Sequence, residues 1–167
     1  MTDSEIKELA SRLVGFLEET AKRQDKGAMA DIRSAASKTA EYRSWKHLAQ
    51  FGGIDTSYAD IVRAVAWLYS VCPRNDSHAG NFGSIVRKIE RARNKDNDGN
   101  DMRIRKLLAC DRGDIAANVM KFGGYLKNTD IRIDFTNLFI DMFFWSDGVK
   151  MRWAEAYYNS ANSGGKE

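Results

Sequence analysis

The sequence predicts an all-α protein in which about nine helices form a compact bundle. Among the 167 residues there is one proline, Pro73, so almost no position interrupts a helix. Leu, Ala, Lys, Arg and Glu, which favour helices, are frequent. Apolar residues recur at intervals of three and four over most of the chain, which is the period of a helix with one buried face.

The first half of the chain is expected to form four helices. Thr2 and Glu5 have the spacing of a capping box, which marks the start of the first helix. The other three are expected to begin near Asp25, near Thr39, and at a cap formed by Ser57 or Asp55.

The third of these helices, around residues 39–50, is predicted to bury aromatic side chains. At helical spacing, Tyr42, Trp45 and either Leu48 or Ala49 fall on its inward face. The sequence FGG that follows is a typical end of a helix.

Two basic helices are predicted next, at SIVRKIERAR (residues 84–93) and MRIRKLLACDR (residues 102–112). The acidic segment between them, NKDNDGND (residues 94–101), has the composition of a calcium loop. An EF-hand loop needs glycine at its sixth position and glutamate at its twelfth. Counted from the first aspartate, Gly99 is fourth and Leu107 is twelfth. We therefore predict a polar surface loop and no calcium site.

The segment after the basic helices contains an amphipathic pattern with two interior glycines. Apolar residues spaced four, three and four apart run from Ile115 to Leu126, which predicts a helix. Gly123 and Gly124 each weaken it by roughly 1 kcal/mol relative to alanine. Either a neighbouring helix approaches closely there or the helix bends, and the sequence leaves both open.

Two further helices complete the predicted fold. Asp134 is expected to cap the first, which carries a phenylalanine-rich apolar stripe. Asp141 falls on the opposite face, where it is expected to be solvated. The last helix, about residues 148–160, is expected to bury Val149 and Trp153.

The composition, 43% hydrophobic and 29% charged, is typical of a globular domain. We expect one domain over residues 1–161 and a flexible tail over 162–167. The polar segment 73–81 also suits a boundary between two lobes, 1–73 and 80–161. No membrane span or signal peptide is recognised, so a cytoplasmic location is predicted.

Catalytic and metal-binding motifs are not found in the sequence. There is no Walker loop, HExxH, CxxC, GxSxG or GxGxxG, so an enzyme is not expected and no cofactor is predicted. Cys72 and His78 are too few ligands for a zinc site. Cys72 and Cys110 lie among apolar residues and are expected to be free, buried thiols.

Positive charge is concentrated in one part of the chain, although the net charge is only +3. Residues 87–112 contain nine basic and five acidic residues. The positions expected to project outward from the two basic helices are Arg87, Lys88, Arg91, Arg103 and Lys106. Two such rows suit phosphate groups, which give affinity without reading base sequence. By composition alone a charged row on a helix is usually its solvated face, so that interpretation stays open beside phosphate binding.

Several short segments occur in an order that resembles a known family. They are DKGAMADIR (25–33), IVRKI (85–89), NDMRIRKLLACDR (100–112), IDF (133–135) and, after Trp145, RWAEAYY (152–158). In this order the chain resembles the small subunit, the CasB family, of the type I-E CRISPR Cascade surveillance complex.

The resemblance implies a non-catalytic helical subunit that acts in antiviral defence. It implies other Cascade protein subunits, guide RNA, target DNA with its displaced single strand, and a second copy of the chain as partners. The implied role is to bind nucleic-acid backbone and stabilise the R-loop. The alternative is a helical protein-interaction or assembly module that makes no nucleic-acid contact.

The resemblance also extends the candidate nucleic-acid-binding set, because Arg33, Arg87, Arg103 and Lys150 match basic positions of the family. The complete candidate set is Arg33, Arg87, Lys88, Arg91, Arg103, Lys106, Lys150 and Arg152.

Overall fold

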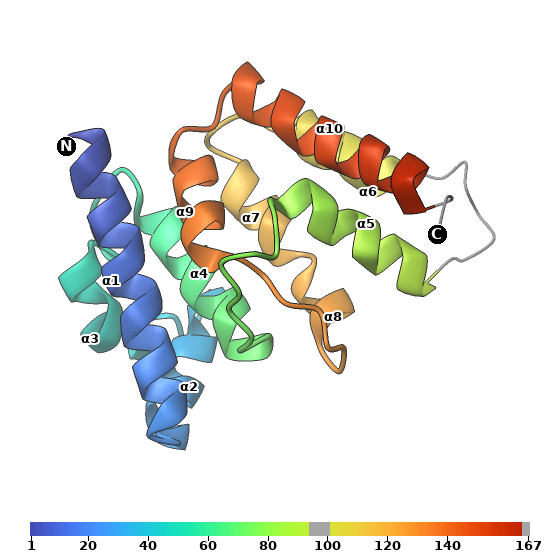
Figure 1. Cartoon of the computed structure of the whole chain (residues 1–167). Coiled ribbons are helices and arrows are strands. Elements are labelled where there is room, and N and C mark those ends of the chain that lie inside the picture. The colour runs from blue at the N-terminus through green and yellow to red at the C-terminus, as the bar shows by residue number, and fades with distance from the viewer. Residues whose placement is uncertain (94–100, 165–167) are drawn as a thin grey trace.

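The fold was analysed in a computed structural model that describes residues 1–93 and 101–164, with side chains described up to Asn159. The all-α prediction is confirmed: the described residues form ten α-helices and two short 3-10 helices (Figure 1). The predicted loop over residues 94–101 lies outside the described residues except for Asp101. None of the described helices is long and apolar enough to cross a membrane.

The helices follow one another closely in the first half of the chain. Their bounds are α1 Asp3–Lys22, α2 Lys26–Arg33, η1 Ser34–Ala36, α3 Tyr42–Leu48, η2 Ala49–Phe51 and α4 Ala59–Val71. The second half contains α5 Phe82–Arg93, α6 Met102–Leu108, α7 Ile115–Met120, α8 Gly123–Leu126, α9 Phe135–Phe143 and α10 Asp147–Gly164.

Three predicted helix starts are confirmed by side-chain caps. Thr2 and Glu5 form the capping box of α1. Asp25 accepts a hydrogen bond from the backbone N–H of Ala28 at the start of α2, and Asp134 caps α9 in the same way. Each cap satisfies an N–H group that has no partner inside its helix.

Helix α4 is the centre of the bundle and packs against α1, α2, α7, α8 and α9. The predicted cap by Ser57 or Asp55 is wrong, because Tyr58 is at the N-cap position and makes no side-chain cap. Arg112 holds this end instead. Its guanidinium donates to the Asp60 carboxylate at 3.1 Å and to the backbone carbonyl of Ser57 at 3.4 Å.

Helix α3 presents its aromatic residues to solvent, so the inward placement predicted for Tyr42 and Trp45 is wrong. Tyr42 is 55% exposed and Trp45 is 38% exposed. The buried face consists of Ser44 and Leu48, one helical turn apart. A contact of 3.0 Å between the His47 ring and the Asp31 carboxylate of α2 helps to fix this orientation.

The predicted helix from Ile115 to Leu126 is divided into α7 and α8, and both proposed explanations for its glycines hold. The helix is interrupted between Met120 and Gly123. A Cβ at Gly123 would lie 2.3 Å from the Trp67 ring of α4, so the neighbouring helix also approaches closely. Gly124 has open space around its Cβ position.

Asp141 is buried, with 5% of its surface exposed, so its predicted solvated position is wrong. Its Oδ2 accepts a hydrogen bond from the Trp153 indole at 2.8 Å, and its Oδ1 lies 3.7 Å from the Arg152 guanidinium. Burial raises the pKa of the Asp141 carboxyl, and the contacts with Trp153 and Arg152 lower it in part.

Helix α10 crosses α5 with the backbones in close contact. A Cβ at Gly83 would lie 2.0 Å from the backbone oxygen of Trp153. The rings of Phe82 and Trp153 pack beside this point, with centroids 5.5 Å apart. Buried apolar residues from α1 to α10 belong to one core cluster. The division into lobes at residues 73–81 stays a prediction.

Both predicted thiols are free and buried. Cys72 and Cys110 form no disulfide. The Cys72 thiol lies against the end of α4, and its sulfur is 3.2 Å from the Arg74 guanidinium. Burial raises the pKa of the Cys72 thiol, which favours the neutral form despite the nearby cation.

Substituting Gly83→Ala should separate α5 from α10 and lower the free energy of unfolding by about 3 kcal/mol, because the contact atom is backbone and cannot rotate away. Gly124→Ala is the matched control and should be neutral or slightly stabilising, since its Cβ position is open. Urea unfolding measures both. Equal effects of the two changes would contradict the close crossing.

Replacing Asp141 by Asn should change how stability depends on pH. A raised pKa in the folded state means that the Asp141 contribution is fully present below the ordinary pKa of 3.8 and is lost as pH rises through the folded value. Wild type should therefore lose stability relative to Asp141→Asn as the pH rises from 3.8 through the raised pKa of the folded state, which denaturant unfolding at a series of pH values measures. A relative gain by wild type over that interval would reverse the assignment.

Candidate nucleic-acid interface

The two basic helices are placed by their apolar residues. Ile85 and Ile89 of α5 and Ile104 and Leu107 of α6 are buried, which leaves the basic residues at other positions around each helix. Helices α5, α6 and α10 pack against one another, so three cation-bearing helices meet in the second half of the molecule (Figure 1).

Arg87 does not project outward with its neighbours, as the sequence predicted. Its guanidinium lies 5.7 Å from the centroid of the Tyr157 ring on α10, and its Nε is buried without a hydrogen-bond partner among the described residues. The Tyr157 hydroxyl donates to buried Glu90. The pKa of Tyr157 is raised by burial and by Glu90 and is lowered in part by Arg87. Arg87 therefore belongs to the contact between α5 and α10.

Lys88 and Arg91, in contrast, are exposed on α5. Lys88 lines a hollow of about 440 Å³ that also contains His78, Thr129 and Arg132 from the connections before α5 and after α8. These two cations therefore keep the outward position that the sequence predicted for them.

Arg103 and Lys106 of α6 lie together at a pocket centred on Tyr125 of α8. The Arg103 guanidinium is 4.9 Å from the centroid of the Tyr125 ring, and the Arg93 guanidinium of α5 is 4.4 Å from the same centroid. The pocket has a volume of about 150 Å³. It is lined by Arg103, Lys106, Leu107, Asn118, Lys121, Phe122 and Tyr125.

Positive charge dominates this Tyr125 pocket. The pKa of the Tyr125 phenol is lowered, first by Arg103 and then by Arg93 and Lys106, because cations favour the phenolate. Within the described residues, ion pairs within 4.0 Å involve other cations and none of those around Tyr125. An anion is the natural complement of such a site.

Lys150 and Arg152 lie on the first turns of α10. The Lys150 amino group is 5.9 Å from the centroid of the Trp145 ring, and Arg152 is the partner of Asp141. Lys150 does not line the Tyr125 pocket. Arg152 keeps 61% of its side chain exposed.

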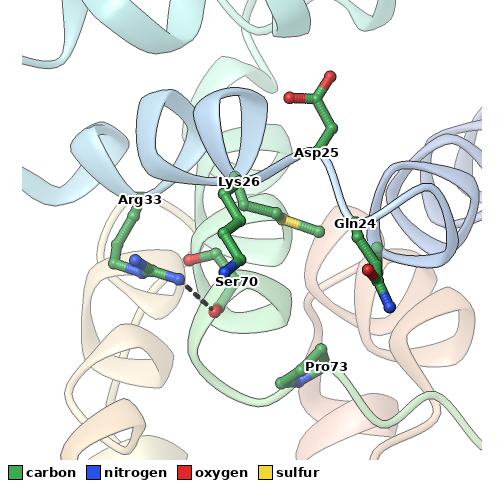
Figure 2. Close-up of a pocket in the computed structure, with 8 residues that line it drawn as sticks. Gln24, Asp25, Lys26, Arg33, Ser70 and Pro73 are labelled. Atoms are coloured by element: carbon green, nitrogen blue, oxygen red, sulfur yellow. Dashed lines mark hydrogen bonds between the residues drawn. The ribbon is translucent and has the colours of Figure 1, made fainter.

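Arg33 is separated from the other candidates. It lies on α2, which packs against α1, α3 and α4 rather than against the basic helices (Figure 1). Its guanidinium donates to the backbone carbonyl of Ser70 at 3.2 Å. Figure 2 shows it beside a pocket of about 670 Å³ that also contains Lys26 and Pro73.

The family of this chain is shown by comparison with known proteins. Residues 28–158 match the family model of the CRISPR-associated protein Cse2. The chain belongs to the Cse2 family. A Cse2 chain, also named CasB, is a small subunit of type I-E Cascade, so the other Cascade proteins are its partners. The family resemblance stated from sequence is therefore confirmed.

A solved structure shows the same fold. The crystal structure of CasB from Thermus thermophilus is similar with a TM-score of 0.66 and 20% sequence identity, over 90% of this chain and 97% of that chain. No curated protein matches this Cse2 chain.

Sequence reasoning missed Tyr125, Lys121 and Arg93 as members of the candidate site. Tyr125 and Lys121 were part of an apparently ordinary amphipathic segment, and only the division into α7 and α8 brings them opposite α6. Arg93 was recognised as basic, but its contact with Tyr125 is a tertiary one. No local spacing signals such a contact.

The half-buried position of Arg87 predicts a mainly structural role. Arg87→Gln should lower the free energy of unfolding by about 1–3 kcal/mol, because it removes the cation that contacts the Tyr157 ring, whose hydroxyl is bound to buried Glu90. Lys88→Gln, an exposed change on the adjacent residue, should stay within about 0.5 kcal/mol of wild type. Chemical denaturation compares the two. Equal stabilities would place Arg87 among the solvent-facing cations instead.

Proposed function

We propose that this chain is a non-catalytic Cascade subunit that holds nucleic-acid strands through their phosphates and thereby stabilises the R-loop. The observation that supports this most is the meeting of Arg93, Arg103, Lys106 and Lys121, from three helical segments, around Tyr125. Such a site offers charge to a phosphate backbone and little to a base edge.

The energetics of R-loop formation make a modest contact useful. Exchanging a DNA duplex for a heteroduplex with guide RNA is nearly balanced in free energy, so backbone contacts can tip it. A subunit in this role needs affinity for any sequence. The exposed candidates Lys88, Arg91 and Lys106 and the half-buried Arg103 supply it, and Lys150 and Arg152 extend the basic region along α10.

Within the complex we propose that this basic region contacts three nucleic acids: the guide RNA, the target DNA strand and the displaced single strand. All three present phosphates at the surface. A second copy of the chain, in the same complex, would lengthen the basic surface. Arg33 is retained as a separate contact, because its pocket lies with α2 and not with α5 and α6.

Removing two cations of the Tyr125 pocket should weaken binding to DNA of any sequence. Arg103→Gln/Lys106→Gln should reduce the affinity for unrelated oligonucleotides roughly tenfold at low salt and reduce the slope of log affinity against log salt by about 2, one for each lost phosphate contact. Fluorescence anisotropy with labelled single-stranded and duplex DNA at several salt concentrations measures both quantities.

The matched control is Lys7→Gln/Lys22→Gln, which removes the same charge from exposed positions of α1. It should leave affinity close to wild type, because α1 is on the other side of the bundle (Figure 1). If both double variants lose the same affinity, net charge and not this surface controls binding. Assembly of each variant into Cascade, followed by R-loop formation on a target plasmid, extends the test to the complex.

The alternative, a protein-interaction module without nucleic-acid contact, is favoured by one observation. Tyr42 and Trp45 are exposed on α3 beside Arg43, and these three residue types dominate protein–protein binding hot spots. This alternative expects no polynucleotide binding even at low salt, and normal R-loop formation by Arg103→Gln/Lys106→Gln once it is assembled.

A further inference from the structure

The Tyr125 pocket differs from a flat row of charges because its cations come from separate elements and surround one small space. Arg103 and Lys106 enter from α6, and Lys121 enters from the end of α7. Lys121 is held there by a 3.5 Å contact with the Asn118 side-chain oxygen. The position of Lys121 is therefore supported by a neighbouring polar group.

The pocket lacks an internal counter-charge among the described residues. Its lining contains three cations and no carboxylate. Asp114, whose backbone carbonyl accepts a hydrogen bond from the Asn118 side-chain nitrogen, does not line the pocket. Like charges gathered without an anion are costly, and sites that keep such a cost are commonly binding sites.

The chemistry and size of the pocket define its ligand. A volume of about 150 Å³ is small for a drug-sized or nucleoside ligand, which needs about 300 Å³ or more. A tetrahedral oxyanion is small enough and accepts hydrogen bonds from several directions. Guanidinium and ammonium groups are the donors that phosphates bind most strongly. Tyr125 lines the pocket beside these donors.

We propose that the Tyr125 pocket is a discrete phosphate-binding site, which seats one phosphate group between Arg103, Lys106 and Lys121. This inference rests on the proposed function, in which the phosphate belongs to a nucleic-acid strand. The pocket then fixes one point of the strand, and the remaining cations contact the rest of it diffusely. The same chemistry accepts free inorganic phosphate, which serves as the probe.

The test uses the Tyr125 phenol as a reporter inside the site. Protein labelled with ¹³C at the tyrosine ring carbon that bears the hydroxyl is titrated by NMR, and the Tyr125 signal is assigned by its loss in Tyr125→Phe. Inorganic phosphate at constant ionic strength, with chloride as the reference anion, should raise the pKa of Tyr125 toward that of an ordinary tyrosine, because the bound anion offsets the cations.

Lys121→Gln removes a pocket cation that is absent from the predicted rows on α5 and α6. It should weaken phosphate binding about threefold to fivefold. Lys127→Gln removes an exposed lysine just after α8 that does not line the pocket, and it should have no effect. The two variants carry the same net charge, so diffuse electrostatics cancels in their comparison.

The outcomes separate the pocket from the wider function. Salt-dependent binding of oligonucleotides, together with no effect of phosphate on Tyr125 and equal behaviour of Lys121→Gln and Lys127→Gln, overturns the pocket and leaves the proposed function standing. A phosphate effect on Tyr125 without oligonucleotide binding supports the pocket as a free-phosphate site and overturns the proposed function. Competition between phosphate and oligonucleotide, weakened by Lys121→Gln alone, supports both.

Discussion

The crossing of α10 over α5 is the contact on which the second half of the molecule depends. At Gly83 the two backbones meet so closely that no side chain fits between them. This approach brings Trp153 against Phe82 of α5 and, through its indole N–H, against Asp141 of α9. One glycine therefore sets the positions of three helices. A larger residue at position 83 would displace all three helices, because the obstructing atoms belong to the backbone and a close-packed protein interior relaxes poorly.

The same crossing divides the basic residues of α5 into two kinds. The side of the helix that α10 covers contains Arg87 and Glu90, whose charges lie beside Tyr157 in a partly buried contact. When one of two charged groups in a partly buried contact is removed, the charge that remains is left without compensation. Lys88 and Arg91 are exposed. Residues adjacent in sequence thus have different roles, which depend on where the partner helix passes.

Local patterns in the sequence predicted most of the helices, because the start and the apolar face of a helix depend on residues that are close in sequence. The capping box at Thr2 and the cap at Asp134 were recognised from spacing alone. The errors concern residues whose environment is set by distant segments. Asp141 occupies a polar position on its own helix but is buried by Trp153, twelve residues later. The spacing of Trp45 is that of a buried apolar residue, yet the buried face of α3 consists of Ser44 and Leu48. The Tyr125 pocket is of the same kind, since it joins α6, α7 and α8.

Several cations that hold the fold together are matched to an oxygen acceptor, whereas among the described residues no carboxylate lies within 4.0 Å of a cation at the Tyr125 pocket. Arg112 is matched to Asp60, and Arg74 donates to the backbone carbonyls of Ile131 and Leu126. Around Tyr125, Arg93 and Arg103 contact the aromatic ring, whose attraction for a cation at an exposed site is only about 0.5–1 kcal/mol, and Lys121 contacts the neutral side-chain oxygen of Asn118. Folding alone gives no reason to gather charge there, since removing a cation would relieve repulsion. The arrangement is explained if an anion from outside the chain completes it, so the pocket exchanges some stability of the free subunit for binding.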